Sequence, residues 1–127
     1  MNKLISYGAI STNFKDFAKL KKELKKIESN EVEPHRLDCY PLENKSIVNN
    51  CFERFGFKTP GFIEIFSPSD KYPLHVDSEK PSESFFIPLR GGIFTYDNID
   101  YPVVPFVLYS FDDSVLHGSN FTSIMIR

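Results

Sequence analysis

The chain of 127 residues has no tryptophan, only three histidines and only two cysteines. Two cysteines, Cys39 and Cys51, are too few for a disulfide-rich scaffold or for a cysteine-based zinc site. We expect free thiols, with a Cys39–Cys51 disulfide as the alternative that their spacing allows. The chain also lacks an excess of positive charge, because 15 basic and 17 acidic residues give a formal charge of -2. This balance argues against a nucleic-acid partner.

No hydrophobic run is long enough to span a membrane, and the first ten residues do not form the apolar segment of a secretory signal. We therefore expect a cytoplasmic protein that has no membrane contact. The length predicts a single domain, residues 1–127, with its own hydrophobic core. Thirteen Phe, six Tyr and nine Pro indicate an aromatic-rich β protein with many turns.

Residues 1–60 are predicted to form a supporting region of helices and strands. The clearest helix is expected over residues 14–28, after a cap at Thr12 or Asn13. Its apolar residues recur at the spacing of one helix face, and they are Phe14, Phe17, Leu20, Leu24 and Ile27. Lysines cover the opposite face, which we interpret as solvent-exposed rather than phosphate-binding. A second helix is expected over residues 45–55, with Ser46 as its cap and Gly56 at its end.

Residues 61–127 are predicted to hold short strands separated by turn-forming residues. The expected strands are Gly61 to Phe66, Tyr72 to Val76, Ser84 to Arg90, Ile93 to Tyr96, Val103 to Ser110, Ser114 to His117 and Phe121 to Arg127. Strands at this spacing are typical of a sandwich or a barrel-like roll. The fold class is therefore mostly β with N-terminal helices, an α+β chain whose helices support one sheet.

The same region contains a candidate metal site. His75 and Asp77 are two residues apart, so on a strand both side chains point to one face. His117 follows 40 residues after Asp77, which is enough chain for about four short strands to return to the same place. Two imidazoles and one carboxylate with open positions are the ligand set of non-haem Fe(II) oxygenases. We interpret the three residues as metal ligands, although a His-x-Asp pair also arises by chance.

The order of His75, Asp77, His117 and Arg127 resembles the motif of the Fe(II)- and 2-oxoglutarate-dependent oxygenase superfamily. The segment from Leu116 to Asn120 is also similar to a turn of the small hydroxylases in that group, including prolyl and aspartyl/asparaginyl hydroxylases. The resemblance covers about residues 61–127. It implies a double-stranded β-helix, a cupin-like jelly roll, for this part. It also implies that Fe(II) is bound by the three ligands and that 2-oxoglutarate is the cosubstrate.

In the family pattern, an arginine binds the distal carboxylate of 2-oxoglutarate through its planar guanidinium. Arg127 matches that position, but no Ser or Thr follows it, and its own α-carboxylate could compete for the guanidinium. Arg90 is the rival anchor. Tyr72 and Tyr109 are expected to contact the cosubstrate, because a buried hydroxyl needs a partner. Phe86 is expected to line the same pocket.

The resemblance implies an oxygenase that hydroxylates an amino-acid residue or a small metabolite and converts 2-oxoglutarate to succinate. The partner would be a small molecule or a peptide, and a homodimer could supply a missing wall of the site. The first alternative is a non-catalytic jelly-roll module that keeps the fold and some metal affinity. A cupin enzyme without 2-oxoglutarate ranks last, because the chain lacks a His-x-His pair with a downstream Glu.

Overall fold

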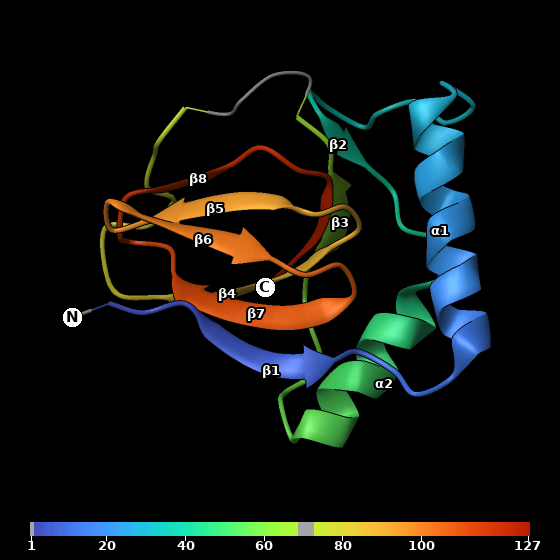
Figure 1. The fold of residues 1–127 in the computed structure, drawn as a ribbon, viewed down its shortest axis with the longest axis horizontal. Coiled ribbons are helices and arrows are strands. Elements are labelled where there is room, and N and C mark those ends of the chain that lie inside the picture. The colour runs from blue at the N-terminus through green and yellow to red at the C-terminus, as the bar shows by residue number, and fades with distance from the viewer. Residues whose placement is uncertain (1, 69–72) are drawn as a thin grey trace.

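The computed structural model describes residues 2–68 and 73–127. Two helices and two antiparallel sheets make up this part of the chain (Figure 1). In chain order the elements are β1 (Ile5–Ala9), α1 (Phe14–Glu28), β2 (Cys39–Tyr40), α2 (Lys45–Phe55), β3 (Ile63–Phe66), β4 (Glu83–Pro88), β5 (Gly92–Tyr96), β6 (Ile99–Val103), β7 (Val107–Asp112), β8 (His117–Ser119) and β9 (Ser123–Ile126). The predicted mostly-β class with two helices is confirmed.

Both helices have the predicted bounds. Asn13 caps α1, because its side chain accepts a hydrogen bond from the backbone N–H of Lys15. Gly56 ends α2 in the left-handed conformation, with φ of 79°. The predicted cap at Ser46 is wrong, because Ser46 lies inside α2. Instead the buried carboxylate of Glu23, on α1, accepts hydrogen bonds from the backbone N–H groups of Glu43 and Asn44 and so joins the two helices.

The larger sheet has the strand order β1-β7-β4-β9-β3-β2, and all of its neighbouring strands are antiparallel. The two helices pack against one of its faces (Figure 1). The buried residues of this layer include Leu20 and Leu24 of α1, Val48 and Phe52 of α2, and Ile65, Ile87, Leu108 and Ile124 of the sheet. The helices therefore support the sheet from outside and leave its second face to the rest of the fold.

The smaller sheet, of order β6-β5-β8, covers that second face. A second core cluster of aromatic residues fills the space between the sheets, and it includes Phe86, Phe94, Tyr96, Tyr109 and Phe121. After β3 the chain crosses several times between the layers, with β4, β7 and β9 in the larger sheet and β5, β6 and β8 in the smaller one. Segments far apart in sequence are thus placed opposite each other across one interior.

Three strand predictions needed correction. Of the strand expected at Tyr72 to Val76, the described residues form only one bridge, between His75 and His117. A strand was expected at Ser114 to His117, but β8 begins only at His117. The residues before it form a turn in which the backbone N–H of Ser114 donates to the side chain of Asp112. The strand expected at Val103 to Ser110 is interrupted by a turn at Pro105. Its first residue is the end of β6, and its last four residues belong to β7.

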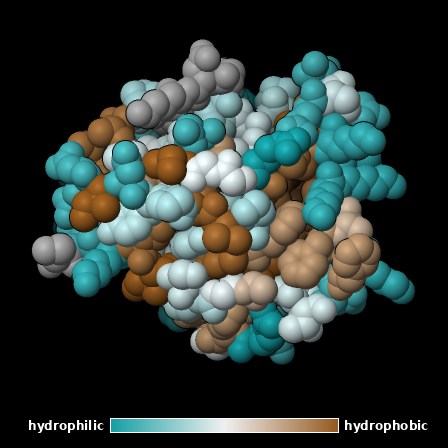
Figure 2. Space-filling view, in the orientation of Figure 1, coloured by the Kyte–Doolittle hydropathy of each residue, from teal (hydrophilic) through white to brown (hydrophobic). Residues whose placement is uncertain are grey.

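The surface agrees with the predicted lysine face of α1. Figure 2 shows hydrophilic side chains gathered over this helix, and its lysines are exposed except for Lys26, which is partly buried and lies 4.0 Å from Glu43. Phe14 departs from the pattern, because it is 77% exposed.

Among the described residues, neither helix has the length and apolar character needed to cross a membrane. Cys39 and Cys51 are both buried free thiols.

Candidate metal centre

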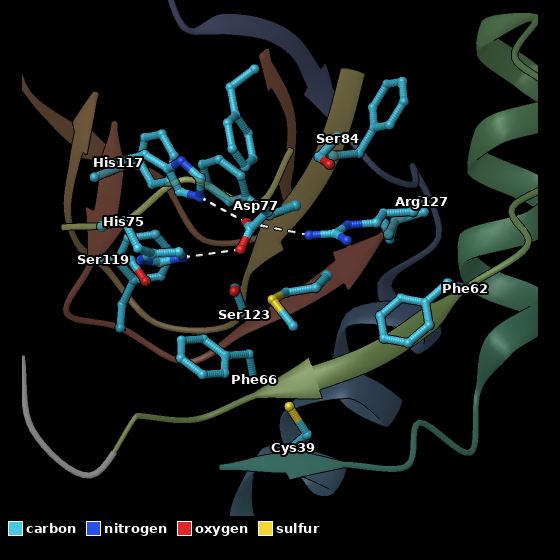
Figure 3. Close-up of a pocket in the computed structure, with 18 of the residues that line it drawn as sticks. Cys39, Phe62, Phe66, His75, Asp77, Ser84, His117, Ser119, Ser123 and Arg127 are labelled. Carbon is cyan, nitrogen blue, oxygen red and sulfur yellow. Dashed lines mark hydrogen bonds and ion pairs between the residues drawn. The ribbon is translucent and has the colours of Figure 1, made fainter. Parts of the chain in front are cut away.

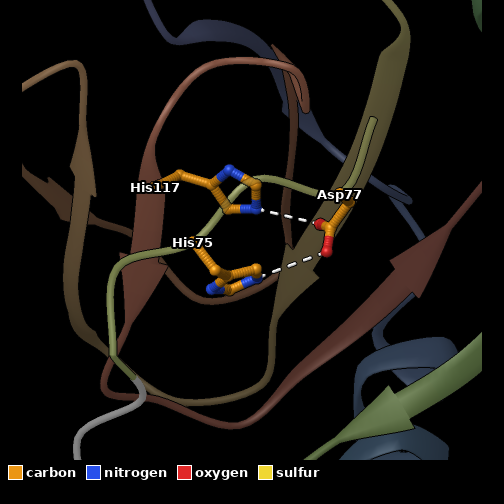
Figure 4. A group of neighbouring side chains, drawn as sticks. All are labelled: His75, Asp77 and His117. Atoms are coloured by element: carbon orange, nitrogen blue, oxygen red, sulfur yellow. Dashed lines mark hydrogen bonds and ion pairs between the residues drawn. The ribbon is translucent and has the colours of Figure 1, made fainter. Parts of the chain in front are cut away.

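The backbones of His75 and His117 form an isolated antiparallel bridge. Each donates its N–H to the carbonyl oxygen of the other at 2.9 Å. Directly paired residues of an antiparallel bridge project their side chains to the same side. The two imidazole rings accordingly lie next to each other, with their centroids 4.5 Å apart (Figure 4). A single bridge therefore brings together two histidines that are distant in sequence.

Asp77 completes the group from the same segment. It lies two residues after His75, and its backbone N–H donates to the carbonyl oxygen of Asp113 at 2.9 Å, just after β7. Its Oδ1 lies 3.5 Å from Nε2 of His75, and its Oδ2 lies 3.1 Å from Nε2 of His117. The ligand atoms of the three residues all lie within 4.8 Å of one another. Such a His-Asp-His group could bind a metal ion.

The second nitrogen of each ring supports this interpretation. Nδ1 of His75 lies 2.9 Å from the carbonyl oxygen of Pro73, and Nδ1 of His117 lies 2.8 Å from that of Val115. A carbonyl oxygen only accepts, so Nδ1 carries the proton in both contacts. In a neutral ring Nε2 then presents a lone pair, and both Nε2 atoms face a carboxylate that also offers only lone pairs. A cation between them resolves this arrangement, so the donor set fits a metal ion.

Burial differs across the three residues. His117 is only 4% exposed and packs against the rings of Phe94 and Phe111. The side chains of His75 and Asp77 keep about a third of their surface, 33% and 29%. One ligand is thus fixed in the aromatic core while the other two border open space. A metal ion held here would have positions left for further ligands.

That open space is a cavity of about 630 Å³ between the two sheets. The triad lies along one part of its wall, and Cys39, Phe62 and Phe66 line another part, on the β2 and β3 side (Figure 3). Aromatic rings, among them Phe86 and Phe94, cover much of the wall between them. The volume is within the range of sites for small molecules. The cavity therefore connects a candidate metal centre with room for organic ligands.

Arg127 points its guanidinium into this cavity (Figure 3). Its Nη2 lies 3.3 Å from Oδ2 of Asp77 and 3.8 Å from Oδ2 of Asp113. Its backbone is fixed by the segment just before β3, because its N–H donates to the carbonyl oxygen of Phe62 and its own carbonyl oxygen accepts from the N–H groups of Gly61 and Phe62. The structure therefore brings Arg127 together with the three candidate ligands, through a direct ion pair with the carboxylate of Asp77.

The other predicted cosubstrate contacts lie elsewhere. Arg90 is outside the cavity, because its guanidinium makes two hydrogen bonds, of 2.6 and 2.7 Å, to the carboxylate of Glu28 on α1. Tyr109 belongs to the aromatic core, where its hydroxyl accepts a hydrogen bond from the backbone N–H of Val104. Both were predicted near the cosubstrate, and the geometry does not support that role. Phe86 lines the cavity as expected, and Tyr72 lies outside the described residues.

Arg36 and Cys39 also line the cavity, and neither was predicted to belong to the site. Arg36 lies on the segment before β2, stacks over the ring of Phe62 at 5.6 Å and pairs with Glu64 at 3.5 Å. Nothing in its local sequence indicates this position. Cys39 follows three residues later. Burial raises the pKa of its thiol, although Arg36 opposes this effect, so Cys39 stays protonated at neutral pH and adds no charge to the cavity.

Asp113 lies between two of the predicted strands, Val103 to Ser110 and Ser114 to His117, where an exposed turn would be expected, yet it is 1% exposed and its carbonyl oxygen accepts from the backbone N–H of Asp77. Its Oδ2 accepts a 2.6 Å hydrogen bond from the hydroxyl of Ser84, which itself lines the cavity. Its position depends on the end of β7 meeting the segment of Asp77, which no local pattern encodes.

Compared with protein-family models, with curated proteins and with solved structures, the chain gives no match.

Proposed function

We propose that the protein is an Fe(II)- and 2-oxoglutarate-dependent oxygenase that hydroxylates an amino-acid residue or a small metabolite. The observation that carries this proposal is the convergence of His75, Asp77 and His117 within 4.8 Å at the edge of a cavity. Two histidines and one carboxylate with open positions are the ligand set of non-haem Fe(II) oxygenases. In both rings Nδ1 contacts a backbone carbonyl oxygen, so Nε2 is the nitrogen that would bind the metal.

The strand arrangement supports the same proposal. In the larger sheet β3, β9, β4 and β7 are neighbours, and opposite them lie the segment of His75, β8, β5 and β6. Eight segments divided equally between two antiparallel layers, with repeated crossings between the layers, correspond to a jelly roll. We therefore propose a double-stranded β-helix as the core of this fold. The metal ligands then lie on two neighbouring segments of its smaller sheet.

The residues of the chain have distinct roles in this proposal. Fe(II) with 2-oxoglutarate and dioxygen would supply the oxidant for an unactivated C–H bond, with one oxygen atom entering the new hydroxyl group, the other entering succinate, and carbon dioxide released. Arg127 would bind the distal carboxylate of the cosubstrate, because a guanidinium offers two parallel N–H donors and stays charged. The rings of Phe86, Phe94 and Phe111 would exclude water from the reacting groups.

The substrate would occupy the part of the cavity beside β2 and β3. Arg36 and Leu37 border it there, and Leu37 is 85% exposed. An exposed apolar side chain next to a stacked guanidinium suits a ligand with both apolar and polar parts. The residues that border this part belong to β2, β3 and the segment before β2, whereas the metal ligands belong to the His75 segment and to β8. Cosubstrate and substrate would therefore be bound by separate groups.

Anaerobic titration of the Fe(II)-loaded protein with 2-oxoglutarate tests the proposal. Chelation through the 2-oxo and carboxylate groups gives a visible metal-to-ligand charge-transfer band, so we expect a saturable band. Glutarate is the matched ligand control, because it has both carboxylates but no 2-oxo group and should give no band. Arg127→Gln should shift the half-saturation point at least tenfold, whereas Arg90→Gln should leave it unchanged. Bound iron without a band would reject the oxygenase proposal.

One observation favours the alternative, a non-catalytic jelly-roll module that retains some metal affinity. Arg127 already pairs with Asp77 at 3.3 Å, so the ligand carboxylate has a counter-charge without any metal ion. The same titration separates the two functions. Iron binding with no response to 2-oxoglutarate would support the module, and a saturable band would support the oxygenase.

A further inference from the structure

Asp113 is a buried carboxylate whose environment satisfies only one of its oxygens. Oδ2 accepts the hydrogen bond from Ser84 at 2.6 Å. Oδ1 is buried and has no hydrogen-bond partner among the described residues. Burying a carboxylate in its charged form is unfavourable unless a cation or several hydrogen bonds compensate it. Asp113 therefore depends on a nearby positive charge.

Arg127 is the nearby cation, but its guanidinium forms ion pairs with two carboxylates at once. Its Nη2 lies 3.8 Å from Asp113 and 3.3 Å from Asp77. The shorter contact is to Oδ2 of Asp77, the oxygen that also lies 3.1 Å from Nε2 of His117. The guanidinium therefore occupies the side of Asp77 that belongs to the ligand group. In the structure it neutralises the same carboxylate that a metal ion would use.

A divalent ion and Arg127 consequently compete for Asp77. Coordination to a metal ion neutralises the carboxylate and weakens its attraction for the guanidinium. Asp113 belongs to no ligand group, and its Oδ2 lies 3.8 Å from the same guanidinium. The electrostatic attraction between Asp113 and Arg127 then remains, while the attraction between Asp77 and Arg127 becomes weaker. The guanidinium would stay in the cavity, with its donors released from the ligand carboxylate.

We propose that Asp113 is a positioning residue that draws Arg127 away from Asp77 and so favours metal binding. Metal binding would transfer Arg127 from Asp77 to Asp113 and leave it ready to bind a carboxylate ligand. This inference rests on the proposed function, which identifies the metal site and the carboxylate ligand. It adds a linkage within the site: whatever strengthens the contact of Arg127 with Asp113 raises the affinity for metal.

Equilibrium dialysis with Mn(II) alone tests this linkage, because it needs neither cosubstrate nor turnover. Asp113→Asn removes the pull on Arg127 and should weaken Mn(II) binding about tenfold, within the usual range of coupling between sites. Arg127→Gln removes the competitor and should tighten Mn(II) binding. The decisive variant is the double substitution of Asp113→Asn with Arg127→Gln. If Asp113 acts through Arg127, Asp113→Asn should have no effect once Arg127 is gone.

Additive effects in this cycle would overturn the proposal, because they would mean that Asp113 acts on the metal only through its charge. Ser84→Ala provides a second variant if Asp113→Asn does not fold. It removes the hydrogen bond to Asp113, so the carboxylate should hold Arg127 more closely and Mn(II) should bind more tightly. Weaker or unchanged binding in Ser84→Ala would also reject the mechanism.

The two proposals fail in different ways. Mn(II) binding with additive effects would reject the role of Asp113 and leave the oxygenase proposal intact. Iron binding without a 2-oxoglutarate band would reject the oxygenase, whereas the Mn(II) cycle would still report on Asp113. If the wild-type protein binds neither Mn(II) nor Fe(II), both proposals are wrong, because both require a metal site at His75, Asp77 and His117.

Discussion

The imidazoles of His75 and His117 lie next to each other because their backbones exchange two hydrogen bonds of 2.9 Å. The two residues belong to segments separated by β4, β5, β6 and β7. The geometry of the candidate centre therefore depends on the tertiary fold and on this one bridge. His35, the third histidine of the chain, is exposed and has no place among the cavity residues.

His75→Ala and His117→Ala should each reduce the affinity for divalent metal at least a hundredfold, because each removes one of three ligands. His117→Ala should also cost about 2–4 kcal/mol of stability, since its buried ring packs against Phe94 and Phe111. Equilibrium dialysis and chemical denaturation measure the two effects. His35→Ala is the control and should change neither. Metal binding retained in both His75→Ala and His117→Ala would place the site elsewhere.

Arg90→Gln should lower the stability slightly at neutral pH and leave metal binding unchanged. Hydrogen bonds from Arg90 lower the pKa of Glu28 from its ordinary value of 4.5. The folded state is therefore stabilised above pH 4.5, and this contribution is lost as the pH falls through the lowered pKa. Most of this pair is exposed, so we expect a small effect. Melting curves of wild type and variant should differ at pH 7 and converge at acidic pH; a constant difference would contradict this account.

Gly92→Ala should destabilise the protein by about 1–3 kcal/mol, because a Cβ at this position would overpack the interior. It would lie 2.6 Å from Oδ1 of Asn120 and 2.9 Å from the side chain of Phe121. The same Asn120 oxygen accepts a hydrogen bond from the backbone N–H of Ile93, so it has little freedom to move. Gly91→Ala is the matched control, since its nearest neighbour would be 3.9 Å away. Denaturation midpoints that fall equally in both variants would reject the steric explanation.

The thiols of Cys39 and Cys51 should react slowly with a disulfide reagent in the folded protein at pH 7.5. Burial raises the pKa of both thiols, and only the thiolate reacts. Both should react quickly once guanidinium chloride unfolds the chain. Ellman's reagent measures the two phases, and a non-reducing mass measurement checks that no disulfide is present. Fast reaction of either thiol in the folded state would contradict the buried positions.

Local patterns predicted the helices and most strands of the core, since these elements carry their signals in their own residues. The apolar spacing of residues 14–28 and the glycine after Phe55 gave the bounds of both helices. β1 was missed because it lacks a regular alternation: its register shifts at Gly8, where φ is 106°. β2 has only two residues, Cys39 and Tyr40, and its pairing with β3 is a tertiary contact.

The proximity of His75 and Asp77 could be predicted, because their spacing places both side chains on one face even without a regular strand. The surroundings of the ligands could not. Asp113 follows Asp112 in a segment that resembles an exposed turn, and its burial arises from contacts with Ser84 and Arg127. Arg90 has the residue type of a carboxylate anchor, but α1 supplies Glu28 as its partner instead.

The bridge between His75 and His117 has a mechanical consequence for the whole C-terminal half. An ion held by these residues would close a covalent loop of chain that contains β4, β5, β6 and β7. Those strands include central members of both sheets. Closing this loop would restrict the unfolded chain, so bound metal would stabilise the folded protein much as a cross-link does. Bound metal would therefore act as a removable cross-link of the C-terminal half.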